Sequence, residues 1–160
     1  IIPKTFYRLS DFSKFIKEEY DTNNSKDGLI FMPEKLPVMN GTQFSMFKWK
    51  PANKHTVDFL IKTVDNNLEA YVYHENNLTK FADILKSQEH GAKFIEEFKQ
   101  LENYNSECIL ECLFMKDTQN FKPVLVRTDK NFPNSLRTVE RTLFNAEENI
   151  LINEFEELKN

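Results

Sequence analysis

The chain has 160 residues, of which 40% are hydrophobic, so it can bury a substantial core and wholesale disorder is excluded. Its net charge of −4 at pH 7 argues against a broad grip on nucleic acid driven by counterion release, although contact with one end of an RNA needs few phosphate contacts. No signal peptide and no apolar run of membrane-spanning length is recognisable. Cys108 and Cys112 lack the further ligands of a zinc site, which indicates free thiols in a reducing compartment.

The first third of the sequence predicts short strands and one helix. Residues 1–9 are apolar and extended in character, as in an edge strand, and Ser10 can cap a helix that continues to about residue 20. The apolar run 29–32 predicts a buried strand, and residues 43–49 predict another. Asp27 lies where the first of these strands begins, a position from which a carboxylate can reach a hard cation such as Mg²⁺.

The rest of the chain predicts several short strands with helices between and after them. This fits an α+β chain with a small five-stranded barrel of the OB type, although propensity alone does not distinguish that barrel from another. The predicted elements are a hairpin of residues 56–64 and 68–74 about residues 65–67, a helical stretch over 78–101 that Gly91 breaks, strands at 107–115 and 123–127, a helix capped by Asn134 or Ser135, and an amphipathic segment at 152–158.

The stretch Phe47-Lys48-Trp49-Lys50-Pro51 carries the first chemical signal. In an extended segment, Lys48 and Lys50 point to one face, while Phe47 and Trp49 point to the other, which can be buried. The two ammonium groups would lie about 7 Å apart, a spacing that suits adjacent phosphates of a polyphosphate. An edge strand with one charged, solvated face is the plainer alternative for these residues taken alone.

Three segments together resemble the mRNA capping guanylyltransferases, which belong to the covalent nucleotidyltransferases. The lysine stretch, with Gly41-Thr42 before it and Thr56-Val57-Asp58-Phe59 after it, is similar to motif V of that superfamily. The run 142–150 especially resembles enzymes of large DNA viruses, and Lys4 and Phe6 are counterparts of an earlier lysine and aromatic. The other two segments are Asp27-Gly28-Leu29-Ile30-Phe31, similar to motif IV, and Arg127-Thr128-Asp129-Lys130-Asn131-Phe132-Pro133-Asn134, similar to motif VI.

The resemblance implies a domain organisation. Residues 1–57 would be the C-terminal part of a nucleotidyltransferase (ATP-grasp/ligase-like) domain, residues 58–150 an OB-fold β-barrel, and residues 151–160 a terminal helix that packs back on the nucleotidyltransferase domain. The nucleophile motif Lys-x-Asp-Gly and the Asp-Gly-Glu segment of the family are missing from the sequence. The chain is therefore interpreted as the C-terminal part of a guanylyltransferase that cannot by itself form the lysyl-GMP.

The same resemblance implies a reaction and a site. The family transfers GMP from GTP, through a lysyl-GMP intermediate, to the 5′-diphosphate end of RNA and so forms the cap. Its motif VI swings over the β- and γ-phosphates and then withdraws so that RNA can enter. On this basis Lys48 and Lys50 contact the α-phosphate, Arg127, Asp129 and Lys130 act on the departing pyrophosphate, and Asp27 binds Mg²⁺ or Mn²⁺.

The implied partners are GTP, the 5′ end of RNA, and triphosphatase or methyltransferase activities on the same or a partner chain, with no membrane. The implied location is intracellular: host cytoplasm or virion for a viral protein, nucleus for a cellular one. Many cellular members have an arginine and a tryptophan where this chain has Leu125 and Phe121. Two alternatives stay open, an ATP-dependent nucleic-acid ligase, which Trp49-Lys50-Pro51 disfavours, and a non-catalytic OB-fold binding module.

Overall fold

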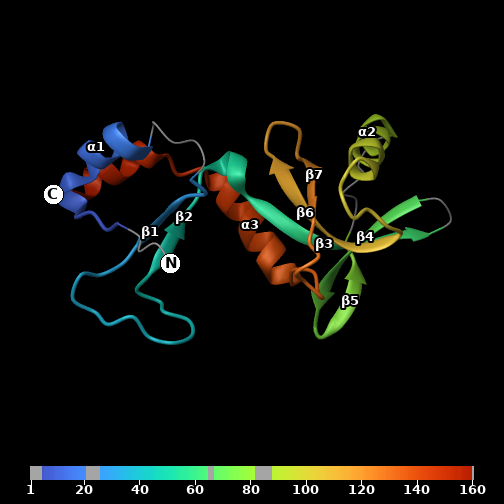
Figure 1. The fold of residues 1–160 in the computed structure, drawn as a ribbon, viewed down its shortest axis with the longest axis horizontal. Helices are drawn as coiled ribbons and strands as arrows, with labels where there is room; N and C mark the ends of the chain where they lie inside the picture. The colour runs from blue at the N-terminus through green and yellow to red at the C-terminus, as the bar shows by residue number, and fades with distance from the viewer. Residues whose placement is uncertain (1–4, 21–25, 65–66, 82–87, 160) are drawn as a thin grey trace. The chain divides into compact units, whose positions relative to one another are not determined.

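The computed structural model of the chain describes residues 5–20, 26–64, 67–81 and 88–159 (Figure 1). The chain divides into two compact units. Unit 1 comprises residues Ile1–Pro51 and Ile150–Asn160, and unit 2 comprises Ala52–Asn149. The chain therefore leaves unit 1, completes unit 2, and returns to unit 1 for its last eleven residues. None of the helices in the described ranges is long and apolar enough to cross a membrane.

Unit 1 combines short helical segments with a two-stranded antiparallel sheet. The predicted helix up to about residue 20 is confirmed as one helical run of mixed type, but Ser10 is not its cap: the run begins at Leu9, so Ser10 lies within the first turn. The predicted strand over residues 1–9 is wrong where the structure describes it, since residues 5–8 join no strand and Phe6 and Tyr7 are exposed; Lys4 lies outside the described residues. The elements are η1 (Leu9–Asp11), α1 (Phe12–Phe15), the π-helical η2 (Ile16–Tyr20), β1 (Leu29–Phe31), β2 (Phe47–Trp49) and η4 (Ile152–Lys159).

An aromatic cluster holds unit 1 together. Phe12, Trp49 and Phe155 are its buried members, and each comes from a different segment of the unit. The Phe155 ring stacks on Phe31 with 4.7 Å between centroids, and the Trp49 indole donates a hydrogen bond from Nε1 to the Ile150 carbonyl at 2.8 Å. Burial of each such side chain stabilises the fold by roughly 1.5–3 kcal/mol. The last residues of the chain are thus part of the packing that supports β2.

Gly28 allows β1 to begin against the backbone of β2. A Cβ added at Gly28 would lie 2.1 Å from the Trp49 carbonyl oxygen and 3.2 Å from the Lys50 Cα. No side chain fits at the first distance, and the neighbouring atoms are backbone that cannot move aside without opening the sheet. Glycine is therefore required here by close approach of two backbone segments.

We expect Gly28→Ala to separate β1 from β2 and to lower the free energy of unfolding of unit 1 by about 2 kcal/mol or more. Because Trp49 is the only tryptophan, its fluorescence emission should shift to the red as the indole becomes exposed. The matched control is Gly41→Ala, at φ +86° with open space around it, where backbone strain alone should cost about 1 kcal/mol. Equal losses from the two variants would contradict the close-approach argument.

Unit 2 is built on a five-stranded sheet in the order β5-β4-β3-β6-β7, and all its strand pairs are antiparallel. A helix lies in the chain between β5 and β6, and a second follows β7 (Figure 1). This confirms the α+β class and the five strands with an inserted helix expected for a partly open OB barrel. The elements are β3 (Thr56–Val64), β4 (Asn67–His74), β5 (Asn77–Lys80), α2 (Gln88–Lys99), β6 (Glu107–Met115), β7 (Asn120–Val126) and α3 (Leu136–Glu148), with the 3₁₀ turn η3 (Ala52–Lys54) before them.

The helical stretch predicted over 78–101 is wrong in its first part. Residues 77–80 form β5, because Glu75 and Asn76 both have positive φ and make a two-residue turn that returns the chain along β4. Residues 82–87 lie outside the described part of the chain. Gly91 does not break the helix: it is a buried position within the continuous α2.

The core of unit 2 lies on one face of the sheet. Alternate residues of β3, namely Val57, Phe59 and Ile61, are almost fully buried there, as the strand period of two requires. Phe94 and Phe98 of α2 and Val139 and Ala146 of α3 complete this core. The predicted cap of the last helix is confirmed as Ser135, whose Oγ accepts a hydrogen bond from the Thr138 N–H at 3.2 Å.

Candidate functional site

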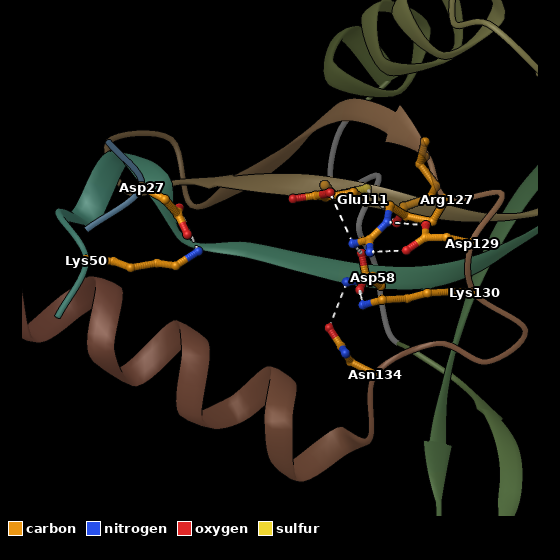
Figure 2. A network of polar contacts seen from close by, with 10 residues as sticks. Asp27, Lys50, Asp58, Glu111, Arg127, Asp129, Lys130 and Asn134 are labelled. Atoms are coloured by element: carbon orange, nitrogen blue, oxygen red, sulfur yellow. Dashed lines mark hydrogen bonds and ion pairs between the residues drawn. The ribbon is translucent and has the colours of Figure 1, made fainter. Parts of the chain in front are cut away.

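Asp27, Lys48 and Lys50 form the first polar cluster, within unit 1. The register of the small sheet pairs Leu29 with Trp49, so the residues just before β1 and at the end of β2 lie close together. Asp27 Oδ2 lies 2.6 Å from Lys48 Nζ, and Asp27 Oδ1 lies 2.9 Å from Lys50 Nζ (Figure 2 shows Asp27 and Lys50). The two lysines predicted to share a face therefore converge on one carboxylate.

The lysines govern the ionisation of Asp27. The hydrogen bond from Lys48, followed by that from Lys50, lowers the pKa of Asp27 from 3.8 to about 2. With two ammonium groups and one carboxylate, the cluster carries a net positive charge, and the Asp27 side chain is 57% exposed. An ammonium has three donors, so both lysines can keep Asp27 and still donate to an incoming anion.

The aromatic residues of β2 behave differently from each other. Trp49 is buried as predicted, and its indole anchors the strand between the two lysines. Phe47 was expected on the buried side but is 54% exposed, although its ring stacks on Phe31 at 4.9 Å between centroids. On the aromatic side of this small sheet, Trp49 and Phe31 are therefore packed in the aromatic cluster, whereas Phe47 is largely exposed.

A groove of about 970 Å³ in unit 1 reaches this cluster. Its lining is mainly apolar, and its charged groups come from Arg8, Lys26, Asp27 and Lys48. Ligand pockets in proteins commonly have volumes of this order and combine apolar walls with a few polar groups. The groove is thus a candidate binding space beside the lysine pair.

The described residues do not by themselves fit a divalent metal ion. They contain no group of three or more His, Cys, Asp or Glu side chains that could hold one. Both oxygens of Asp27 are occupied by ammonium groups, whereas Mg²⁺ and Mn²⁺ prefer several oxygen ligands. The metal role expected of Asp27 therefore stays a prediction.

The second cluster lies within unit 2 and is centred on Arg127, the residue that follows β7. Its Nε and Nη2 donate to the two carboxylate oxygens of Asp129, both at 2.8 Å, in a bidentate pair. Its Nη1 lies 3.4 Å from Asp58 Oδ1 and 3.3 Å from Glu111 Oε2 (Figure 2). Lys130 donates to the other oxygen of Asp58. Arg127, Asp129 and Lys130, predicted together from one motif, therefore meet in one network.

Asp58 is the buried member of this network. It lies on β3 opposite Glu111 of β6, so the two carboxylates share the face of the sheet that is turned away from the core. Only 5% of its surface is exposed, which makes it the one charged residue that is buried in the described part of the chain. A buried carboxylate is tolerated where it is paired and hydrogen-bonded, and Arg127 and Lys130 supply that pairing.

The charges of this cluster reinforce one another. The hydrogen bond to Asp129, with the nearby charges of Asp58 and Glu111, raises the pKa of Arg127. The Arg127 guanidinium lowers the pKa of Asp129 to about 2. Three carboxylates and two cations leave the cluster with a net negative charge, so binding of an anion at Arg127 is favoured when it replaces one of the carboxylate partners.

Sequence reasoning missed three of these residues. Asp58 was noted only as part of a resembling segment, and Glu111 was not singled out. Asn134, whose Oδ1 accepts a hydrogen bond from the Asp58 N–H at 2.8 Å, was considered only as the end of the third resembling segment and as a helix cap. The available signal was a charged residue inside the apolar run 57–61, which can be buried only if cations reach it. Of the two noted departures from cellular sequences, Phe121 is buried in the core and Leu125 is half exposed.

The fold and the two clusters define an α+β protein with an OB-type sheet that presents an arginine and a lysine after its last strand. Comparison with known proteins then gives the family. Residues 41–155, most of the chain, match the family described as "mRNA capping enzyme, C-terminal domain", and the chain belongs to it.

Three curated relatives are similar to most of this chain. They are an mRNA-capping enzyme of Caenorhabditis elegans, 31% identical over 88% of this chain; an mRNA-capping enzyme subunit alpha of Schizosaccharomyces pombe, 27% identical over 79%; and an mRNA-capping enzyme of Mus musculus, 28% identical over 85%. The chain spans only 23%, 34% and 22% of the lengths of these relatives, respectively.

The depressed pKa of Asp27 predicts an acid-resistant ion pair. Because the folded pKa of about 2 is below the ordinary value of 3.8, the pair stabilises unit 1 fully above about pH 4 and is lost as pH falls toward 2. Carboxyl-carbon NMR should find Asp27 about nine-tenths ionised at pH 3. Lys48→Met should raise the midpoint toward 3.8, whereas Lys35→Met, at an exposed lysine of the same unit, should leave it unchanged. An ordinary midpoint in the unmodified chain would contradict the cluster.

Proposed function

We propose that this chain is the C-terminal part of an mRNA guanylyltransferase, which transfers GMP from GTP through a lysyl-GMP intermediate to the 5′-diphosphate end of RNA. The observation that carries the proposal is the convergence of Lys48 and Lys50 on Asp27. All three residues belong to segments that resemble the family, and the match to the capping-enzyme family covers both lysines.

Lys48 and Lys50 would act on the α-phosphate of GTP. Attack by a lysine amine on this phosphorus breaks the bond to the bridging oxygen and releases pyrophosphate, and the lysyl-GMP then passes GMP to RNA. Negative charge on the transferring phosphoryl group is stabilised by cations that are positioned in advance. Asp27 supplies this positioning, because it keeps both ammonium groups at one point before the nucleotide binds.

Arg127 and Lys130 would act on the β- and γ-phosphates. A phosphate oxygen can take the place of a carboxylate oxygen on a guanidinium with the same bidentate geometry. In this mechanism a phosphate oxygen replaces one carboxylate partner of Arg127 while the nucleotide is bound, and that ion pair forms again when pyrophosphate departs. The closing and opening of motif VI described for the family belongs to the same proposal.

The proposal also includes residues, a metal ion, a location and associated activities that this chain does not itself contain or display. We expect the nucleophilic lysine and most of the guanine pocket to come from sequence that this chain does not contain. We also propose Mg²⁺ or Mn²⁺ as a companion of the triphosphate, and an intracellular location. Triphosphatase or methyltransferase activity on the same or a partner chain, and a relationship to enzymes of large DNA viruses through residues 142–150, are further expectations.

Lys50→Ala and Asp27→Ala, each in the full protein that carries this chain, should lower the yield of covalent GMP by 100-fold or more. The measurement is transfer of ³²P from [α-³²P]GTP to protein, followed by denaturing gel electrophoresis. Lys35→Ala should react normally, and circular dichroism should show that all variants are folded.

Normal label in either site variant would remove the site assignment. Covalent transfer of ³²P to the protein from [α-³²P]ATP in place of [α-³²P]GTP would identify a nucleic-acid ligase of the same superfamily. Absence of covalent nucleotide in the unmodified full protein would favour a non-catalytic OB-fold module.

A further inference from the structure

Asp58 directs all of its hydrogen-bonding groups at the segment 127–134. One carboxylate oxygen accepts from Arg127 Nη1 at 3.4 Å, and the other accepts from Lys130 Nζ. The Asp58 N–H donates to Asn134 Oδ1 at 2.8 Å, and the Asp58 carbonyl accepts from the Asn134 N–H, also at 2.8 Å. Figure 2 shows Asn134 and Lys130 reaching the same residue of β3.

Asn134 takes the place of strand pairing beside Asp58. The ladder between β3 and β4 ends with the pair Leu60 and Tyr71. Continued in the same register, it would join Asp58 to Tyr73, but Asn134 accepts from the Tyr73 N–H at 3.0 Å and pairs with Asp58 instead. The motif VI segment is thus hydrogen-bonded to two strands at this point, as an inserted piece of the sheet.

The carboxylate partners of Arg127 differ sharply in exposure. The side chain of Asp58 is 7% exposed, whereas that of Asp129 is 65% exposed. Asp129 is mostly in water, so its carboxylate is easily rehydrated when an anion from solvent takes over its bidentate contact with Arg127. Loss of the partners of a buried carboxylate leaves an uncompensated charge, which is strongly unfavourable. Asp58 therefore cannot exchange its cations in the way that Asp129 can.

We propose that Asp58 is the positioning residue for the two cations of motif VI, and that Asp129 is the partner that an incoming polyphosphate replaces. Asp58 takes one of the three donors of Lys130 and one side of the Arg127 guanidinium, and the Asn134 pairing fixes the loop between them. The face of Arg127 that Asp129 covers then becomes the face for phosphate. The identity of the anion rests on the proposed function; the positioning role does not.

The positioning role and simple electrostatics predict opposite changes in anion affinity when Asp58 loses its charge. Removal of either carboxylate makes the cluster more positive, so electrostatics alone predicts tighter anion binding by both Asp58→Asn and Asp129→Asn. Positioning predicts the opposite for Asp58. The two variants are matched because they make the same chemical change, one at a buried and one at an exposed partner of the same arginine.

The binding experiment measures the affinity of the full 160-residue chain for inorganic pyrophosphate by isothermal titration calorimetry. Asp129→Asn should bind as tightly as the unmodified chain or more tightly. Asp58→Asn should bind at least ten-fold more weakly, and this loss should disappear when Lys130→Met and Arg127→Met are already present, because Asp58 acts only through those cations. Unchanged or tighter binding by Asp58→Asn would overturn the proposal.

Hydrogen exchange tests the positioning without any ligand. Asp58→Asn should raise exchange of the Arg127, Lys130 and Asn134 amides at least ten-fold while the amides of α2 stay protected. Asn134→Ala, which keeps the charge of Asp58, should do the same to a smaller extent and serves if Asp58→Asn fails to fold. Unchanged exchange would overturn the positioning role. If exchange responds but the unmodified chain does not bind pyrophosphate, the positioning stands and the proposed phosphate function of this cluster is rejected.

Discussion

The pairing of every predicted cation with a carboxylate of its own unit is the constraint on which both clusters depend. In unit 1, Asp27 holds Lys48 and Lys50, and in unit 2, Asp58 is shared by Arg127 and Lys130. Like charges brought this close repel one another unless an anion lies between them. The carboxylates therefore allow these cations to be gathered before a ligand arrives. A polyphosphate that binds either cluster meets cations whose positions are already set, so less ordering is left to the binding step.

The spacing of the two lysines depends on Trp49 as much as on Asp27. Trp49 separates the two lysines in the sequence. Its side chain is buried among aromatic rings and donates a hydrogen bond to the Ile150 carbonyl, which fixes the orientation of β2 and so the face on which the lysines lie. Gly28 brings the start of β1 against the Trp49 carbonyl, which places Asp27 beside the ends of both lysine side chains. Steric fit, a single hydrogen bond and charge thus act on consecutive residues. The lysine pair is a consequence of how β2 is packed, in addition to its order in the sequence.

Local pattern predicted those parts of the structure that depend on neighbouring residues. The strand period placed β3 and β6, and the Ser135 cap marked the start of α3. It failed where distant partners decide: residues 77–80 are a strand because β4 lies beside them, and residues 5–8 are not, because no strand of the described chain pairs with them. The hydrogen-bond partners of the Asp58 side chain and backbone lie more than sixty residues further along the chain, and no local periodicity in the sequence can indicate them. Motif resemblance identified the cations, but the carboxylates that hold them required the fold.

The two clusters differ in a way that bears on their roles. Asp27 is exposed, so both lysines can exchange their partner for a phosphate oxygen with little desolvation cost. In the other cluster, burial divides the carboxylates into a fixed group at Asp58 and an exchangeable one at Asp129. In the proposed function, the first cluster would hold a phosphate through a chemical step and the second would bind a phosphate and then release it. Easy exchange with retained donors would suit the first role, whereas a fixed anchor with one replaceable partner would let Arg127 return to a defined position after each release.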